Sequence, residues 1–321
     1  MGSGPGDPPA RRGPALSLPP LRKRVKRAVR TWLLRGLLAI VKLLPLGAAL
    51  ALGRAGGGLA YGVFAKDRRL ALEHLAKAFP EKTPEEQEAI ARAMFRSLGE
   101  TGMEIAQIDK LDRRLESYVE IEPSAVAALD QARKGSGVVA VTGHIGNWEL
   151  LFRRIVRSGR PAYAVGAELS HGGLTAIVEE LRGPGRTIWR GAPGASKKLL
   201  RAFREDAYLA LLIDQDTKVQ GVFVPFFGEL AHTPRAAADL ALRTGAGIVT
   251  IFIHRKAGGG HRISGRQVEY TPTGDPEADA LAITAEMTRA IEEEVRRVPH
   301  EWVWMHRRWQ TRPPDERALG S

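Results

Sequence analysis

A histidine and a glutamate with four residues between them follow a hydrophobic run, and both have the side chains needed for acid–base chemistry. Residues 138–142 are apolar or β-branched, and Gly143, His144, Gly146 and Glu149 come after them. If the chain turns back at Gly146, the Glu149 carboxylate can reach one imidazole nitrogen and leave the other free as a general base. Such a base accepts the proton of a hydroxyl that attacks an acyl carbon. The spacing equally fits a histidine that caps a strand–helix turn, with Glu149 stabilising the helix N-terminus.

The elements expected around this pair alternate between strand and helix. Short apolar runs interspersed with helical stretches predict an α/β fold with a mostly parallel sheet flanked by helices. In such sheets ligands bind at the carboxyl ends of the strands, which is where His144 stands. The predicted strands are 138–142, 164–165, 208–213, 248–253 and 262–270, and the predicted helices are 148–158, 174–181, 195–203, 234–243 and 276–298.

A helical lead-in precedes this α/β core. Thr83 and Glu86 have the spacing of a capping box, and Pro84 suits the first turn of the helix that would follow. We therefore expect a helical lead-in over residues 66–115 and an α/β core over residues 116–321, which together form one domain of residues 66–321.

The charge of the chain is concentrated at its N-terminus. The first 70 residues hold 14 Lys and Arg and two acidic residues, which accounts for the whole net charge of +12. The rest of the chain is electrically balanced, which is a poor match for a nucleic-acid-binding protein and favours contact with membrane lipids. Cysteine is absent, so disulfides, thiolate metal sites and cysteine nucleophiles are excluded.

The first 65 residues divide into a tail and a membrane-associated segment. Residues 1–20 are rich in Pro and Gly, and we predict that they are disordered. Residues 21–65 combine a basic collar with an apolar zone that charges interrupt, so no stretch approaches the ~18–20 apolar residues of a spanning helix. Pro45 and the glycines of 56–58 argue against one straight helix. Three interpretations remain: a weak single span, helices lying in the membrane interface, or a cationic amphipathic helix packed on the domain.

Three further segments carry residues with chemical potential. Asp214 and Asp216 follow an apolar strand and are either functional or simply turn-forming. The aromatic run 223–228 either lines an acyl-chain groove or belongs to the core. The Trp, His and Arg residues of 302–309 either meet phosphate headgroups at the membrane interface or close the domain by cation–π packing.

Several of these blocks, in this order, resemble one family. The segment 143–149, with His144-x-x-x-x-Glu149, resembles the H-x4-D/E motif of the glycerolipid acyltransferase superfamily, and in particular the bacterial lipid A biosynthesis (lauroyl/myristoyl) acyltransferases. The resemblance runs from about Arg68 to the C-terminal region. The other matching blocks are 78–80, 95–99, 214–216, 221–228, 231–233 and 304–313.

The resemblance implies a glycerolipid-acyltransferase-like fold and a reaction. An acyl chain would pass from acyl carrier protein to a hydroxyl of a lipid A precursor, a secondary acylation in lipopolysaccharide biosynthesis, without metal or other cofactor. The enzyme would work at the cytoplasmic face of a bacterial inner membrane. His144 would be the general base and Glu149 its orienting partner. The implied supporting residues are Gly146 and Asn147 as backbone oxyanion donors and Asn147, Arg190, Asp214 and Asp216 as substrate-binding residues.

Other functions remain open at this point. The acceptor would differ in an acyltransferase for another glycolipid, such as a phosphatidylinositol mannoside. The same His–Glu pair would activate water in a membrane-bound acyl hydrolase or thioesterase. A lipid-binding protein without catalytic activity would need neither residue.

Overall fold

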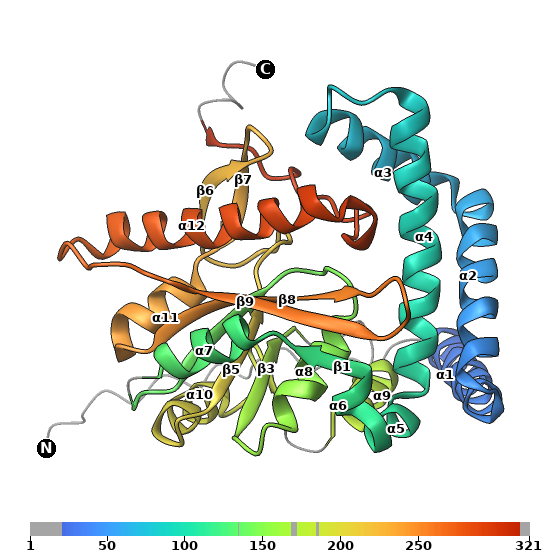
Figure 1. The fold of residues 1–321 in the computed structure, drawn as a ribbon, viewed down its shortest axis with the longest axis horizontal. Coiled ribbons are helices and arrows are strands. Elements are labelled where there is room, and N and C mark those ends of the chain that lie inside the picture. The colour runs from blue at the N-terminus through green and yellow to red at the C-terminus, as the bar shows by residue number, and fades with distance from the viewer. Residues whose placement is uncertain (1–20, 134, 168–171, 184–185, 315–321) are drawn as a thin grey trace, which may run out of the picture.

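A seven-stranded sheet forms the centre of the computed structural model, which describes residues 21–133, 135–167, 172–183 and 186–314 (Figure 1). The tail predicted at residues 1–20 lies outside the described residues. Five neighbouring strands are parallel, and β9 and β1 run the other way because β8 and β9 pair antiparallel. The mostly parallel sheet predicted from the sequence is thus confirmed. In sheet order the strands are β1 (Val119–Ile121), β9 (His261–Val268), β8 (Gly247–Arg255), β2 (Val138–Thr142), β5 (Tyr208–Leu212), β3 (Ala162–Gly166) and β4 (Thr187–Trp189).

Helices cover both faces of the sheet because alternate side chains of each strand point to opposite sides. On β2, Val138 and Ala140 pack with α7 and α8, whereas Val139 and Val141 belong to the cluster that includes α10, α11 and α12. In Figure 1, α12 lies across the upper part of the sheet. The helices after β1 are α7 (Pro123–Gln131), α8 (Trp148–Val156), α9 (Gly172–Arg182), α10 (Ala195–Arg204), α11 (Ala236–Thr244) and α12 (Pro276–Arg297), followed by η2 (Pro299–Glu301).

The aromatic run at 223–228 forms a separate antiparallel hairpin of β6 (Gly221–Phe226) and β7 (Glu229–Pro234). Phe226 and Phe227 are buried, and their rings contact Trp302 and Trp304 respectively. These two aromatic residues therefore belong to the core, as one of the two sequence interpretations held.

Helices joined by short turns make up the described chain before the sheet. The predicted capping box is present, because Thr83 Oγ1 accepts from the Glu86 amide at 3.3 Å and Glu86 Oε2 accepts from the Thr83 amide at 2.8 Å. Pro45 separates the first two helices, as expected. These elements are α1 (Leu21–Leu43), α2 (Leu46–Val63), α3 (Ala65–Ala78), α4 (Pro84–Ala106), α5 (Ile108–Leu111), η1 (Asp112–Arg114) and α6 (Leu115–Tyr118).

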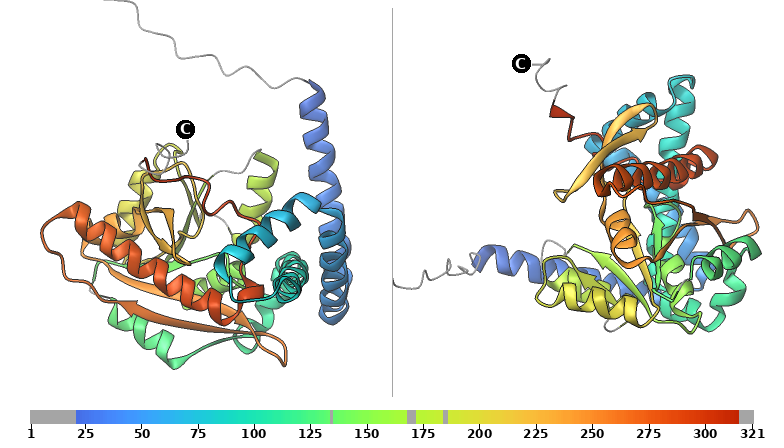
Figure 2. Two further views of the ribbon diagram at one scale, coloured as in Figure 1. Left: turned by 90° about the horizontal axis from the view of Figure 1, so that it is seen from above. Right: turned by 90° about the vertical axis from the view of Figure 1, so that its left-hand side faces the viewer.

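The glycines of 56–58 lie inside one continuous helix, so the expectation that they would interrupt it is wrong. The reason is close packing: α2 runs beside α4 (Figures 1 and 2), and a Cβ on Gly57 would lie 2.1 Å from the carbonyl oxygen of Phe95. Gly53 and Gly99 approach each other in the same way. Glycine is used here because it lets two helix backbones touch.

This packing gives a matched pair of expected results. Gly57→Ala should destabilise the protein by about 1–3 kcal/mol, because the added methyl group overlaps the α4 backbone. Gly56→Ala should be neutral or stabilise by about 0.5–1 kcal/mol, because no atom lies within 4 Å of its Cβ position and alanine favours helix. Thermal unfolding followed by circular dichroism measures both, and equal stabilities of the two variants would contradict the packing argument.

The N-terminal helices are tied to the domain on one side and carry apolar residues on the other. The Gln107 side-chain amide donates to the Val41 carbonyl at 2.6 Å, and Lys42 pairs with Asp109 at 2.7 Å. In contrast, Trp32 and Leu43 are 75% and 83% exposed. Within the described part of the chain, no helix combines the length and the hydrophobicity that a bilayer crossing requires.

Candidate active site

His144 and Asp214 meet because they follow neighbouring strands in the same register. Thr142 of β2 is paired with Leu212 of β5, and each of the two functional residues comes two positions later. His144 Nδ1 lies 2.8 Å from Asp214 Oδ1, and the backbone N–H of His144 donates to Asp214 Oδ2 at 2.7 Å. The carboxyl edge of the sheet therefore brings together an imidazole and a carboxylate 70 positions apart in the sequence.

The Asp214 carboxylate is fully buried and takes three donors. Besides the two from His144, the indole N–H of Trp302 donates to Oδ2 at 2.8 Å. Burial acts to raise the pKa of Asp214, but the charge of His144 and these hydrogen bonds outweigh it and hold the pKa well below its ordinary value. An ionised carboxylate at Nδ1 places the imidazole proton there, so that Nε2 carries a free lone pair.

The sequence predicts that Glu149 contacts His144, but in the structure the Glu149 carboxylate binds Arg182. Arg182 NH2 and Nε donate to the two Glu149 oxygens at 2.6 and 2.9 Å, a bidentate pair that fixes the guanidinium plane. Glu149 stands in the first turn of α8 and points towards the C-terminal end of α9. The motif spacing is the predicted one, but the orienting carboxylate on the histidine comes from Asp214.

Gln215 and His306 complete the surroundings of the histidine. The Gln215 side-chain nitrogen is 3.1 Å from each ring nitrogen of His144 and 2.7 Å from His306 Nε2. Burial, with the charge of His144, lowers the pKa of His306 to about 4. His306 is therefore neutral at physiological pH and accepts a hydrogen bond from the amide.

A cavity of about 600 Å³ opens beside these residues. His144, Glu149, Arg182 and Gln215 line it, together with Arg190, whose side chain is exposed. Apolar residues make much of the rest of the wall, which suits a ligand with both a hydrocarbon and a polar part. The apolar wall includes Ala164, Val165, Val178, Leu211, Leu212, Ile213, Val219, Pro234 and Ala236.

Across residues 21–133, 135–167, 172–183 and 186–314, no three His, Asp or Glu side chains are grouped to hold a metal ion.

Two groups of the residues predicted to bind substrate or an oxyanion are bonded within the protein: the Asn147 side chain and the Gly146 backbone amide. Asn147 is fully buried: its oxygen caps α8 by accepting from the Leu150 amide, and its nitrogen donates to Glu104. The Gly146 amide donates to the carbonyl of Glu301 at 3.0 Å, so it is not free for an oxyanion. Gly146 is nevertheless needed for the turn, since its φ is +59° and a Cβ would lie 2.1 Å from the Ile253 oxygen.

The other predicted aspartate also has a structural position. Asp216 Oδ2 accepts from the Thr311 amide at 2.6 Å and Oδ1 accepts from the Thr311 hydroxyl at 3.1 Å, which anchors the segment after Trp309. The carboxylate oxygens of Asp214 and Asp216 thus bind groups of the protein. The aromatic and basic residues of 302–309 are largely interior as well, with Arg308 buried over the Phe226 ring at 4.9 Å. This arrangement matches the domain-closing interpretation of the block.

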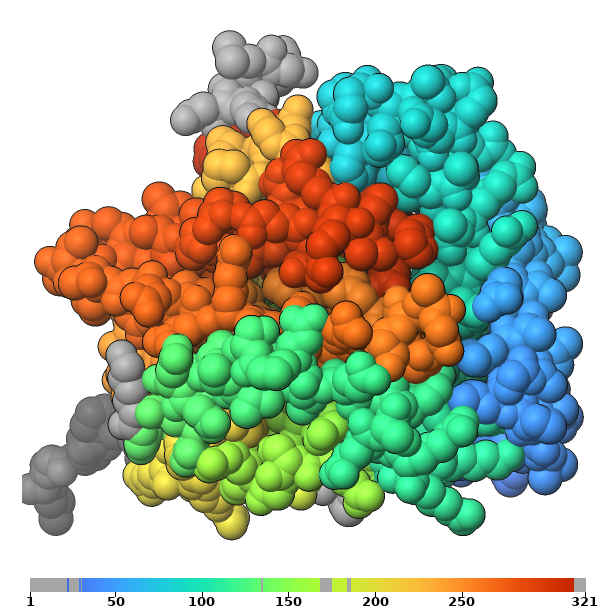
Figure 3. Space-filling model, in the orientation of Figure 1, coloured from blue at the N-terminus to red at the C-terminus, as the bar shows by residue number. Residues whose placement is uncertain are grey.

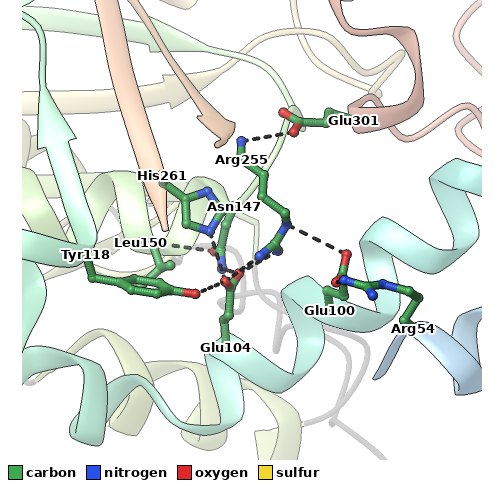
Figure 4. A network of polar contacts seen from close by, with 9 residues as sticks. All are labelled: Arg54, Glu100, Glu104, Tyr118, Asn147, Leu150, Arg255, His261 and Glu301. Carbon is green, nitrogen blue, oxygen red and sulfur yellow. Dashed lines mark hydrogen bonds and ion pairs between the residues drawn. The ribbon is translucent and has the colours of Figure 1, made fainter. Parts of the chain in front are cut away.

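A second polar cluster surrounds the Glu104 carboxylate and reaches Asn147 at the start of α8 (Figure 4). The buried Glu104 of α4 accepts from Arg255 at 2.7 and 2.9 Å, from Tyr118 at 2.6 Å and from Asn147 at 2.9 Å, and it lies 3.0 Å from His261 Nε2. Through Asn147 this cluster joins α4, β8 and β9 to the start of α8. It therefore fixes the helix that presents Glu149.

Three residues of the site were not identified as such by the sequence interpretation. Gln215 and His306 lie in blocks that the family resemblance singled out, so position within those blocks was the available signal. Arg182 had no local signal, because its significance comes only from the partner on α8.

The chain belongs to the bacterial lipid A biosynthesis acyltransferase family, whose model matches residues 21–311. A lipid A biosynthesis palmitoleoyltransferase of Escherichia coli (strain K12) is 30% identical over 309 residues, which cover 90% of this chain and 94% of that protein. A lipid A biosynthesis lauroyltransferase of the same organism is 28% identical over 293 residues, covering 88% and 92%. A phosphatidylinositol mannoside acyltransferase of Mycolicibacterium smegmatis is 26% identical over 196 residues, covering 60% and 62%.

The resemblance seen in the motif blocks is thereby confirmed over nearly the whole chain. The protein is an acyltransferase of the lipid A biosynthesis family.

Proposed function

We propose that the protein transfers a fatty acyl chain from acyl carrier protein to a hydroxyl of a lipid A precursor, with His144 as general base. The observation that carries the proposal is the His144–Asp214 pair beside a cavity whose wall is partly apolar and carries the exposed Arg190. The apolar wall suits the acyl chain, and the Arg190 guanidinium suits an anionic group of the substrates. No metal or redox group is needed for this chemistry.

In the proposed step, His144 Nε2 takes the proton of the acceptor hydroxyl while its oxygen attacks the thioester carbon. The tetrahedral intermediate collapses with loss of the carrier thiolate, which takes the proton back from His144. Asp214 keeps the proton on Nδ1 and stabilises the imidazolium that forms. Glu149 acts by holding Arg182 at the cavity, not by contacting the base.

Substitution of the base tests this function. His144→Gln should lower kcat by about 10²- to 10⁴-fold, the usual contribution of a positioned general base, with little change in thermal stability. The measurement is transfer of labelled acyl groups from acyl carrier protein to a tetra-acylated lipid A precursor by the detergent-solubilised protein. Wild-type rates in the variant would exclude His144 as the base. Transfer only to a phosphatidylinositol mannoside would change the acceptor, and acyl release without any acceptor would indicate a hydrolase.

We further propose that α1 and α2 lie in the interface of the inner membrane, with the catalytic domain on its cytoplasmic face. Most of the exposed large hydrophobic residues are on these helices, and Leu33, Leu37 and Ile40 share one face of α1. In the space-filling view the N-terminal helices form one side of the molecule (Figure 3). The basic residues at the start of α1 would add attraction to anionic lipid.

Vesicle flotation measures this attachment. The full chain should float with vesicles that contain anionic phospholipid, and Leu37→Asp with Ile40→Asp should reduce the floated fraction, because two charges would enter the apolar face. The matched double substitution Leu200→Asp with Leu281→Asp, at exposed leucines of α10 and α12 with the same change of charge, should reduce it far less. Equal flotation of the two double variants would contradict the proposed orientation.

A further inference from the structure

The proposed reaction needs a hydrogen-bond donor for the negative charge that develops on the carbonyl oxygen. One of the two backbone donors expected from the sequence, the Gly146 amide, is occupied because it donates to Glu301. A donor that serves the transition state has to be fixed, close to the base and open to the cavity. Gln215 meets all three conditions.

Gln215 is close to the base without blocking it. Its side-chain nitrogen is equally far, 3.1 Å, from Nδ1 and Nε2 of His144. An atom equidistant from the two ring nitrogens lies on neither in-plane lone-pair direction, so it stands beside the ring. The Nε2 lone pair thus remains open to an acceptor hydroxyl, and the amide of Gln215, which lines the cavity, lies next to where that hydroxyl would bind.

His306 fixes the amide. A carboxamide nitrogen carries two hydrogens, and at 2.7 Å one of them is donated to His306 Nε2. The segment that holds His306 is itself immobilised, because Trp304 and Arg308 are fully buried on either side of it. Since burial and the charge of His144 keep His306 neutral, it remains an acceptor while the reaction proceeds. Because the carboxamide group is planar, holding one N–H on His306 also fixes the direction of the second N–H of Gln215.

We propose that Gln215 donates its second N–H to the oxyanion of the tetrahedral intermediate and that His306 is its positioning residue. The inference rests on the proposed acyl transfer. When the acceptor oxygen bonds to the thioester carbon, the π electrons of the carbonyl group move to its oxygen, and the Gln215 N–H stabilises that charge. When the carbonyl group re-forms, the C–S bond breaks and the sulfur takes the proton from His144 Nε2.

Gln215→Leu tests this role, because it keeps the size of the side chain and removes the donor. Its kcat should fall by about 10²- to 10³-fold, as for other oxyanion donors, while KM stays within about twofold. His306→Phe keeps an aromatic ring but removes the acceptor, and kcat should fall by about tenfold, as for one lost hydrogen bond, with KM again unchanged. Combining the two should cost no more than Gln215→Leu alone, because both remove the same interaction.

The control is Gln310→Leu, the same change at an exposed glutamine outside the cavity, which should retain wild-type kcat and KM. Thermal unfolding of each variant shows whether it is folded. Transfer by wild type together with an unchanged kcat in Gln215→Leu would overturn the inference and leave the proposed function standing. An increase in KM alone would also overturn it, since that would assign Gln215 to ground-state binding. Absence of transfer by wild type would overturn both.

Discussion

Asp214→Asn is expected to lower kcat by about 10⁴-fold with little change in KM, as the equivalent change does in Ser-His-Asp triads. The hydrogen bonds explain why. Asp214 Oδ2 accepts from the His144 backbone N–H and from the Trp302 indole, so the oxygen of the asparagine has to take that place. Its NH2 group then faces His144 Nδ1, which becomes the acceptor. The imidazole proton moves to Nε2, and the base is lost although every atom of the ring stays in position.

Thermal unfolding of the same variant distinguishes this effect from simple damage to the fold, because a change of tautomer leaves the stability near that of wild type. Asp216→Asn is the matched control, because that carboxylate is also largely buried but bonds Thr311 and His232 instead of His144; it should retain most of the wild-type kcat. If Glu149→Gln lowered kcat to this extent and Asp214→Asn did not, the orienting role predicted for Glu149 from the sequence would be correct after all.

The parts of the site that could be predicted from the sequence are those built by neighbouring residues. The strand at 138–142, the turn at Gly146 and the helix that begins at Trp148 follow from one continuous stretch, and so does the place of His144 at the carboxyl edge. The same holds for the capping box at Thr83 and Glu86. In each case the hydrogen bonds or packing that define the feature join residues a few positions apart.

The partner of His144 could not be predicted in this way, because it depends on the register of β2 against β5. The local spacing favours the carboxylate five positions away, but the first turn of α8 directs Glu149 towards Arg182. The glycines of α2 show the same limit. Their low helix propensity predicts a break in the helix, whereas the close contact of Gly53 and Gly57 with α4 requires residues without a side chain. Long-range pairing, which a single sequence does not display, decides both cases.

The buried Glu104 cluster is expected to give the largest effect on stability. Glu104→Gln should lower the free energy of unfolding by about 3–5 kcal/mol, the usual result of breaking a buried ion pair. Arg255 would keep its charge with only Glu100, at 3.7 Å, as an acidic neighbour, while Tyr118 and Asn147 would compete for the one remaining oxygen. The exposed Glu116→Gln is the matched control and should change stability by less than about 0.5 kcal/mol.

The contribution of Glu104 to the free energy of unfolding should also decrease as the pH falls. Burial acts to raise the pKa of Glu104, but the hydrogen bonds and charges of His261 and Arg255 outweigh it and lower the pKa to about 2 from an ordinary 4.5. Because the folded-state pKa is depressed, the stabilisation is complete above pH 4.5 and is lost as the pH falls towards 2. Urea unfolding of wild type and Glu104→Gln across that interval should therefore show the difference between them shrinking as the solution becomes more acidic. A difference that stayed constant would mean that packing, not the charge of Glu104, makes the cluster stable.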